Sequence, residues 1–330
     1  MKNLHLAQIY ALNPIIENLK EKGCNTDKLL KKSGLHHFNL QRSEGYVPIK
    51  LLYNFYEEVY TSAGVCDFID EFADSFQLIA GLQYGELVAH ASDFLTGCQV
   101  ALKYDQVLFT NEKLFLKING NKSIIANRFI DASEEGHENI AFTDLALMIN
   151  TIRLHSGKSW QPYDVYIQCK KTPSLDSLLP DKQATNVFVD HEFTGISFDT
   201  SLLKKPLLNS NISTGIKPDI NKLDTLSSKI ELLLESNCHL RLPSIQKMAE
   251  FTDMSLRTFQ RTLSAEDKNF TQIIENWRFK KSLEMLEKPS VKIKEISQRL
   301  CYSNVPNFEH AFRRWTNTHP LNYRSQLPIQ

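Results

Sequence analysis

Residues 242–265 read LPSIQKMAEFTDMSLRTFQRTLSA, and the spacing of their apolar side chains decides the architecture of the last third of the chain. The spacing predicts two short helices, each with one buried face: Ile245, Met248 and Ala249 on the first, and Leu256, Phe259 and Leu263 on the second. Ser255 stands where it can cap the second helix. The open face of that helix keeps Arg257, Thr258, Gln260 and Arg261. Two short helices joined by a tight turn are typical of a helix-turn-helix unit.

The same plan returns about 48 residues later, in the stretch KIKEISQRLCYSNVPNFEHAFRRW at residues 292–315. We expect Ser303 to cap its second helix. The buried face would hold Ile293, Ile296, Leu300, Phe308, Ala311, Phe312 and Trp315. The open face would carry Asn304, Asn307, His310, Arg313 and Arg314. One such unit is a weak signal, since any two short amphipathic helices imitate it, but two units joined by a helix over residues 270–286 are much more specific.

The side chains on the two open faces suit the major groove of DNA. Arg pairs with guanine edges and Gln or Asn with adenine edges, while Ser and Thr bind bases or phosphate. The alternative is that both faces are merely solvated. We favour DNA contact, and the predicted DNA-binding residues are Ser255, Arg257, Thr258, Gln260, Arg261, Ser303, Asn304, Asn307, His310 and Arg313. For Arg278, an ion pair inside the domain and a phosphate contact both stay open.

The charge of the chain is divided unevenly. Of 38 Lys and Arg and 38 Asp and Glu, residues 236–330 hold 15 and 9, which leaves 23 and 29 for residues 1–235. The helix-turn-helix part is therefore basic and the rest acidic. A basic end on an otherwise neutral chain points to nucleic acid as the partner, although this excess is modest.

The chain before residue 205 has an α+β pattern. Two β-prone runs are joined by Asn119-Gly120-Asn121, which is a strong hairpin signal. Strands are expected at residues 114–118, 123–130, 164–169, 186–189 and 195–198, and helices at 13–19, 46–60 and 140–154. The sequence therefore predicts an α+β N-terminal domain with a mixed or antiparallel sheet, followed by an all-α C-terminal domain with two helix-turn-helix motifs.

Turn-forming residues crowd residues 204–219 and mark a boundary. We predict an effector-sensing or dimerisation domain at 1–205, a linker at 206–220 and a DNA-binding domain at 221–330, with helix-turn-helix units at about 242–265 and 292–315. Leu223, Leu226, Ile230 and Leu233 step by three and four. That stripe suits a coiled-coil dimer seam or a first packing helix, and we favour the packing helix because the stripe is short.

Several classes of protein lack support in the sequence. No apolar run approaches the roughly 18–20 residues that span a bilayer, and the N-terminus lacks a signal-peptide pattern, so we expect a cytoplasmic protein without membrane contact. The cysteines at 24, 66, 98, 169, 238 and 301 are too scattered for a zinc or CxxC site, and we interpret most as buried apolar residues. No nucleophile elbow, P-loop or metal-spaced histidine pair is present. We therefore predict no enzyme activity, no catalytic residue, no metal and no cofactor.

The residues of both units resemble a known family. The run from Met254 to Leu263 resembles the first recognition helix of AraC/XylS-type regulators, and residues 308–315, with Pro320, Tyr323 and Arg324, resemble the end of that family's domain. This resemblance covers residues 222–330. Ser159-Trp160-Gln161-Pro162, residues 165–169 and residues 198–207 resemble, more weakly, the arabinose-binding-like N-terminal domain of one subgroup.

Three positions depart from the family pattern. The family usually has glycine where this chain has Cys301 and Asn317, and near Asp267-Lys268. Glycine serves in such turns because they demand a positive φ. Asparagine reaches that region readily, whereas cysteine does so at a cost. The resemblance therefore predicts either a strained turn at Cys301, with some loss of stability, or a reshaped turn.

The resemblance implies a sequence-specific transcription regulator, an activator by the family's habit, with double-stranded DNA and RNA polymerase as partners. Two recognition helices would enter major-groove faces about one helical turn apart, roughly 34 Å. The N-terminal domain would bind a small-molecule effector, form a homodimer, or both. The alternative is a regulator controlled by a protein partner or by oligomerisation, with no small ligand. An enzyme with a DNA-targeting module, as in alkylation-repair methyltransferases, would need a reactive cysteine flanked by specific proline and histidine, and no cysteine here has them.

Overall fold

The structure is a computed structural model, and it describes residues 4–9, 12–40, 45–62, 91–130, 137–170, 175, 178–179, 181, 183–206, 225–237 and 242–327. Two compact units divide the chain. One comprises His5–His36 and Val47–Asn221, and the other Met1–Leu4, His37–Tyr46 and Lys222–Gln330. Helices and strands mix before residue 206, and every element after it is a helix, which confirms the predicted fold class. Most of the predicted linker 206–220 lies outside the described residues, so the domain boundaries stay a prediction.

The chain begins with short helices and a strand pair. The helices are α1 (Asn13–Glu21), α2 (Thr26–Ser33), the 3-10 turn η2 (Leu35–His37) and α3 (Ile49–Ser62). The strands β1 (Leu6–Gln8) and β2 (Tyr46–Pro48) pair with each other. The helix expected from Tyr46 starts only at Ile49, because Val47 precedes Pro48 and a residue before proline avoids the helical region.

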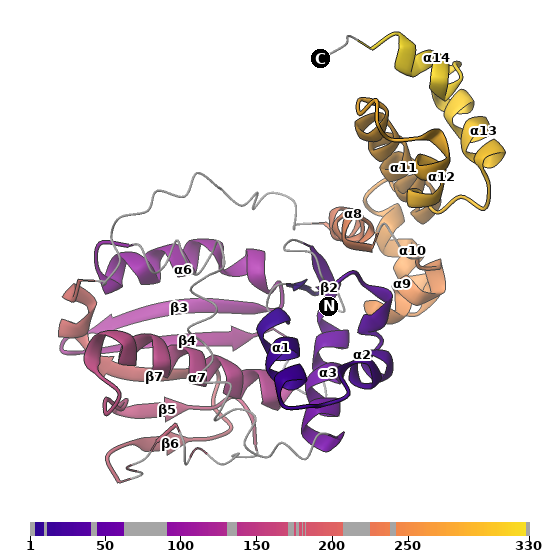
Figure 1. Cartoon of the computed structure of the whole chain (residues 1–330). Helices are drawn as coiled ribbons and strands as arrows, with labels where there is room; N and C mark the ends of the chain where they lie inside the picture. Colours follow the sequence, from indigo (N-terminus) through magenta and orange to yellow (C-terminus); the bar gives the residue numbers. More distant parts are fainter. Residues whose placement is uncertain are drawn as a thin grey trace. The chain divides into compact units, whose positions relative to one another are not determined.

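A five-stranded sheet forms the centre of the α+β unit (Figure 1). Its strands are β3 (Glu112–Asn119), β4 (Lys122–Phe129), β5 (Asp164–Tyr166), β6 (Asn186–Phe188) and β7 (Thr194–Asp199), in the order β3-β4-β7-β5-β6. Only β5 and β6 run parallel. Asn119 pairs with Lys122 across a two-residue turn, and Gly120 in that turn has φ +59°, so the predicted hairpin is confirmed.

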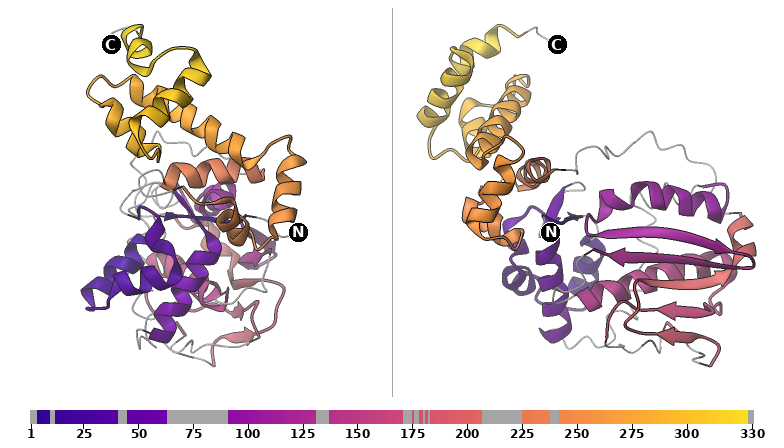
Figure 2. Two further views of the ribbon diagram at one scale, coloured as in Figure 1. Left: turned by 90° about the vertical axis from the view of Figure 1, so that its right-hand side faces the viewer. Right: turned by 180° about the vertical axis from the view of Figure 1, so that it is seen from behind.

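Helices cover one face of this sheet. The helix α7 (His137–Ser156) packs against β7, and the strands stand in front of it when the unit is seen from behind (Figure 2). Phe94 of α6 (Phe94–Leu108) meets Phe198 of β7, with ring centroids 5.8 Å apart. On the same face Ile125 and Ile196 pair across strands and are both buried. The alternate positions of β4, among them Lys122 and Arg128, belong to the open face.

Seven helices make up the part of the chain described after residue 224. They are α8 (Leu226–Asn237), α9 (Ile245–Phe251), α10 (Leu256–Ser264), α11 (Phe270–Leu286), α12 (Ile293–Arg299), α13 (Val305–Thr316) and α14 (Pro320–Ser325). The helix α8 packs on α10 and α11 and buries Leu226, Ile230 and Leu233. These three residues of the stripe therefore belong to a packing helix, as predicted, and Leu223 lies outside the described residues.

The structure also shows where the cysteines lie and whether its helices or side-chain clusters suit a membrane or a metal ion. Cys98 and Cys169 are buried, Cys24 and Cys301 are half-buried, and positions 66 and 238 lie outside the described residues. Within the described ranges no helix is long and apolar enough to cross a membrane. The same ranges hold no group of three His, Cys, Asp or Glu side chains arranged for a metal ion.

Candidate nucleic-acid interface

The first helix-turn-helix unit is closed by side-chain caps. Ser244 Oγ accepts a hydrogen bond from Lys247 N (3.2 Å) at the start of α9, and Ser255 Oγ accepts one from Thr258 N (3.2 Å) at the start of α10. The turn between the helices contains Asp253 with φ +51°, a conformation that aspartate tolerates. These caps satisfy backbone N–H groups that a helix leaves unpaired, and they fix where α10 begins.

The helix α10 has one buried and one open face. Phe259 and Leu263 are buried against the domain, and Phe259 packs edge-on to Phe270. The predicted DNA-binding side chains of α10 lie on the exposed side or half-buried at its rim: Ser255, Arg257, Thr258, Gln260 and Arg261. Leu256 was expected in the core but is 37% exposed, because it is the first helical residue and no earlier turn covers it.

The second recognition helix is capped one residue later than predicted. Asn304 is its N-cap, and Asn304 Oδ1 accepts a hydrogen bond from Asn307 N (2.9 Å). Ser303 lies outside the helix, where its Oγ accepts from Asn307 Nδ2 (2.7 Å). Asn304 is fully extended, and Pro306 fits the first turn because the N–H it lacks would have no helical partner there. The expectation that Ser303 caps α13 is therefore wrong.

The open face of α13 is otherwise placed as expected. Phe308, Ala311 and Phe312 are buried. The five predicted contact residues of this unit are exposed: Ser303, Asn304, Asn307, His310 and Arg313. Arg314 was also expected on this face, but it pairs with Glu275 of α11, with Nη2 2.6 Å from Oε1. That pair directs Arg314 toward α11 and neutralises its charge, and the side chain stays 62% exposed.

Arg278 and Arg324 have structural roles that sequence patterns do not reveal. Arg278 Nε donates to Leu300 O (3.0 Å) and Nη2 to Cys301 O (3.2 Å), while the guanidinium lies 4.2 Å from the centre of the Tyr302 ring. Arg278 thus binds backbone carbonyls rather than a carboxylate, so the predicted ion pair is wrong, and the phosphate contact stays a prediction. Arg324 likewise donates to Leu286 O and Val291 O. Both arginines fix backbone far away in the sequence, so no local signal predicts them.

The three turns that lack the family's glycine keep its backbone conformation. Asp267, Cys301 and Asn317 have φ values of +54°, +56° and +56°. Asn317 caps the end of α13, and its N–H donates to Arg313 O (2.8 Å). Cys301 follows α12 and starts the turn that Arg278 clamps. The strained turn predicted at Cys301 is present, because the backbone geometry of the motif requires it whichever residue is there.

We expect Cys301→Gly to stabilise the chain by about 1 kcal/mol, since glycine reaches positive φ without the steric penalty that cysteine carries. Asn317→Gly should change stability by only a few tenths of a kcal/mol, because asparagine already tolerates this region. Urea denaturation of the two variants and the parent chain measures both effects. A clear loss of stability in Cys301→Gly would show that the sulfhydryl contributes more than the backbone strain costs.

The cations on the open faces are not neutralised by neighbours. No ion pair in the described part of the chain involves Arg257, Arg261 or Arg313. Some basic groups elsewhere on the same domain are paired, such as Arg299 with Glu295 (2.6 Å) and Lys281 with Glu284 (2.8 Å). Three unpaired guanidinium groups on two exposed recognition helices are an electrostatic arrangement that favours a polyanion.

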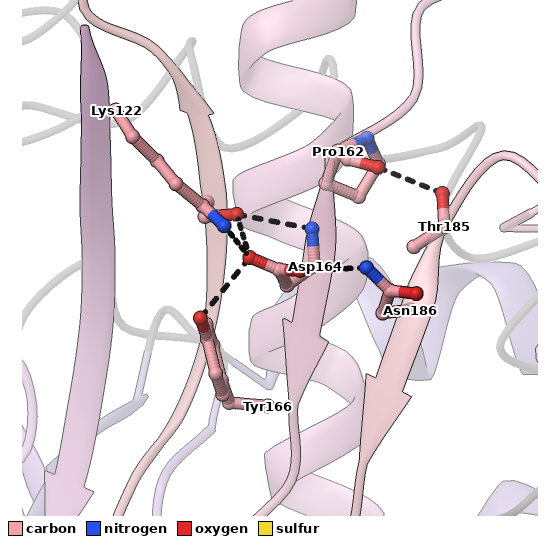
Figure 3. Close-up of polar contacts among 7 residues, drawn as sticks. Lys122, Pro162, Asp164, Tyr166, Thr185 and Asn186 are labelled. Carbon is pink, nitrogen blue, oxygen red and sulfur yellow. Dashed lines mark hydrogen bonds and ion pairs between the residues drawn. The ribbon is translucent and has the colours of Figure 1, made fainter.

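A second polar centre lies in the α+β unit, around Asp164 (Figure 3). Its Oδ2 accepts from Ser197 Oγ (2.6 Å), from the Tyr166 hydroxyl (3.1 Å) and from the Lys122 ammonium, and its Oδ1 accepts from Asn186 Nδ2 (3.0 Å). Burial alone would raise the pKa of this carboxyl, but the donors outweigh it and lower the pKa of Asp164 to about 2. The centre ties together β4, β5, β6 and β7, and the chain's own side chains satisfy it.

Comparison with known proteins identifies both parts of the chain. The family model described as the arabinose-binding domain of AraC transcription regulators, N-terminal, matches residues 23–207. A helix-turn-helix domain model matches residues 248–326. The chain belongs to the AraC family of transcription regulators. The members that it resembles are regulators rather than enzymes, and the family resemblance drawn from the sequence is confirmed.

Two relatives from one organism match this AraC-family chain over less than a third of its length. The HTH-type transcriptional regulator VqsM of Pseudomonas aeruginosa is 34% identical over 102 residues, which is 31% of each chain. The ornithine utilization regulator of the same organism is 29% identical over 82 residues, covering 25% of this chain and 24% of that protein. The match thus spans less than a third of the length of these relatives.

Two solved structures are similar to this AraC-family chain. The transcriptional regulator CdpR from Pseudomonas aeruginosa aligns over 96% of this chain and 98% of its own, with 15% identity and a TM-score of 0.43. The DNA-binding domain of AdpA, solved in complex with a target DNA, covers 31% of this chain and 92% of its own, with 20% identity and a TM-score of 0.28.

Proposed function

We propose that this chain regulates transcription by binding specific duplex DNA through α10 and α13. The observation that carries the proposal is the pair of capped, exposed recognition helices, on which Arg257, Arg261 and Arg313 have no carboxylate partner among the described residues. Such helices present donors to base edges while their N-termini attract phosphate. Membership of the AraC family supports the same function.

The two recognition helices make different contributions to the proposed DNA binding. On α10, Arg257, Gln260 and Arg261 read bases, and the hydroxyls of Ser255 and Thr258 contact phosphate. On α13, Asn304 and Asn307 already use part of their hydrogen-bonding capacity on each other and on Ser303. His310 and Arg313 are then the main contact residues of the second unit. The first unit therefore supplies most of the base preference.

The N-terminal domain senses a small molecule, forms a homodimer, or does both, and the regulator activates transcription through RNA polymerase in the cytoplasm. Support for these finer roles comes from the match to the arabinose-binding-like domain, whose label implies no particular ligand here. The second candidate is a regulator without a small ligand. The Asp164 centre favours it in one respect, since four side chains of the chain itself already donate to that carboxylate.

The experiment that tests the proposal compares single variants on two kinds of DNA. Arg257→Ala and Gln260→Ala should each weaken binding to the cognate site by about 1–3 kcal/mol and relax the preference at one or two base positions. Genome-wide mapping of binding sites provides the cognate duplex, and fluorescence anisotropy provides the affinities at one fixed salt concentration.

The matched control is Lys280→Ala on α11, because Lys280 pairs with Glu231 (3.6 Å) and lies off the recognition helices. It should leave the affinity for the cognate site within twofold. An equal loss on random duplex for Arg257→Ala and Gln260→Ala would show that these side chains hold phosphate. Absence of binding to any duplex from the host genome would overturn the proposed function.

A further inference from the structure

Exposed apolar side chains gather at one edge of the five-stranded sheet. Of the eight large apolar residues that are exposed in the described part of the chain, four lie on or beside β6: Tyr163, Val187, Phe188 and Val189. Each is between 41% and 48% exposed. Tyr163 joins this edge because its carbonyl accepts from Asn186 N (3.0 Å). Contiguous exposed apolar surface marks an interaction site far more often than single exposed residues do.

The backbone of β6 has a free side at this edge. Asn186 N donates to Tyr163 O, and Phe188 O accepts from Ile167 N (2.8 Å), so these two residues point their backbone groups at β5. Backbone groups alternate along a strand, and those of Val187 and Val189 therefore point away from the sheet. Among the residues that the structure describes, the sheet order ends at β6, so these N–H and C=O groups form an unpaired strand edge.

Charged side chains protect the opposite edge of the sheet against pairing with another strand, and this edge lacks them. The other edge strand, β3, carries exposed Lys113 and Lys117, the kind of residue that prevents edge-to-edge pairing. Residues 183–189 contain no charged residue and no proline. The contrast between the two edges of one sheet indicates that β6 is left open for a partner.

The sequence of this edge is complementary to itself. Antiparallel pairing centred on Val187 sets Val187 opposite Val187 of a second copy, Phe188 opposite Asn186, and Val189 opposite Thr185. Asp190 then faces Ala184, so no like charges meet. A strand that accepts its own copy in this way gives a closed two-fold dimer.

The edge is also held in place before any partner binds. Asn186 is fixed to Asp164 (3.0 Å), and the Phe188 ring stacks on Tyr166 with centroids 5.4 Å apart and planes 15° from parallel. Tyr166 in turn packs against His191 and Phe193. A preformed strand loses little conformational entropy on pairing, which lowers the cost of association.

We propose that β6 pairs antiparallel with β6 of a second copy of this chain and joins the two five-stranded sheets into one. This names the surface for the dimerisation that is part of the proposed function. It also assigns a role to the Asp164 centre, which fixes the register of the edge strand. The two DNA-binding domains of the dimer would then bind paired half-sites, and tethering would raise the affinity for such operators.

The test is the oligomeric state of the full chain in variants of this edge. Val187→Pro removes an N–H that points away from β5, so it leaves the internal sheet bonds intact. Sedimentation equilibrium should show a dimer for the parent chain at micromolar concentration and a dissociation constant weakened about 100-fold for Val187→Pro. Val187→Lys keeps the N–H but sets two ammonium groups together at the two-fold axis, and it should also give monomers.

The matched control is Ile118→Lys on β3, at a residue that is 50% exposed on the opposite edge, and it should stay dimeric. A parent chain that is monomeric at every concentration, or a dimer that survives both Val187 variants, would overturn the proposal. Binding to a duplex with a single half-site separates the two inferences. The Val187 variants should bind it like the parent chain, and failure of the parent chain itself to bind DNA would overturn the proposed function while leaving the β6 dimer standing.

Discussion

Raising the salt concentration from 50 to 200 mM should weaken operator binding roughly 10³–10⁴-fold, which is the largest effect that we expect for this chain. About 5–8 phosphate contacts from lysine and arginine displace that number of condensed counterions, so the affinity falls steeply as salt replaces them. The exposed lysines Lys268, Lys292 and Lys294 have no ion pair within the described residues and would add to the arginines of α10 and α13.

Anisotropy titrations at five or six salt concentrations measure this slope. Lys292→Ala should reduce the slope by about one unit and weaken cognate and random DNA alike, because a phosphate contact carries no sequence information. Lys280→Ala, whose ammonium already pairs with Glu231, should leave the slope unchanged. An affinity that does not vary with salt would contradict the proposal that lysine and arginine side chains of this domain contact DNA phosphates.

The α+β unit should lose stability as the pH rises from 5 to 8, which is opposite to the usual behaviour of paired carboxylates. Glu112 and Asp144 are both buried, and Asn127 Nδ2 donates to Asp144 Oδ2 (3.0 Å) and lies 3.5 Å from Glu112 Oε2. Burial, with the neighbouring charge of Asp105, raises the pKa of Asp144 to about 7. Burial and the charge of Asp144 raise the pKa of Glu112 well above its usual value.

The sign of the effect follows from proton binding. Since the folded pKa values exceed the unfolded ones, the folded chain binds more protons, and this stabilisation is complete below about pH 4 and lost as the pH passes 7. Asp144 alone should contribute a loss of roughly 2–3 kcal/mol between pH 5 and pH 8. Asp164, whose pKa is lowered to about 2, titrates outside this window and does not contribute.

Urea titrations at each pH, with hydrogen-exchange mass spectrometry of peptides from β4 and α7, report on this unit alone. Asp144→Asn keeps an oxygen that accepts from Asn127 Nδ2, and it should flatten most of the pH dependence. Glu21→Gln at the exposed end of α1 is the control and should change nothing. A parent chain equally stable at pH 5 and pH 8 would show that the two carboxyls are hydrated in solution.

Local signals predicted the elements whose geometry is decided within a few residues. Ser255 caps α10 because a serine oxygen reaches an N–H three residues on, and Gly120 turns the hairpin because it accepts positive φ. Where two neighbouring residues can both cap a helix, the predicted cap was off by one residue: Asn304 caps α13, and Ser303 does not. The extended residues before Pro48 were assigned to the helix that follows, because their side chains are apolar like those of that helix.

What the sequence could not show depends on residues far apart in the chain. Arg278 meets carbonyls more than twenty positions away, and nothing near it distinguishes it from a surface arginine. Burial of Glu112 beside Asp144 follows from the packing of α7 on the sheet, whereas sequence reasoning treats carboxylates as exposed. The open faces of α10 and α13 were predicted because helical periodicity alone separates them from the core, but their contacts with DNA stay predictions.

The clamp of Arg278 on the turn after α12 has a consequence for how this domain tolerates sequence change. Two carbonyls of the turn are held by a side chain from α11, so the shape of the turn does not depend on the residue at its apex. A chain can then accept cysteine where glycine is usual and lose only a small amount of stability. The tolerance lasts only while the arginine is present, and the two positions are therefore epistatic. A chain that keeps Arg278 could therefore lose the glycine, whereas a chain that lost the arginine first would have to retain it.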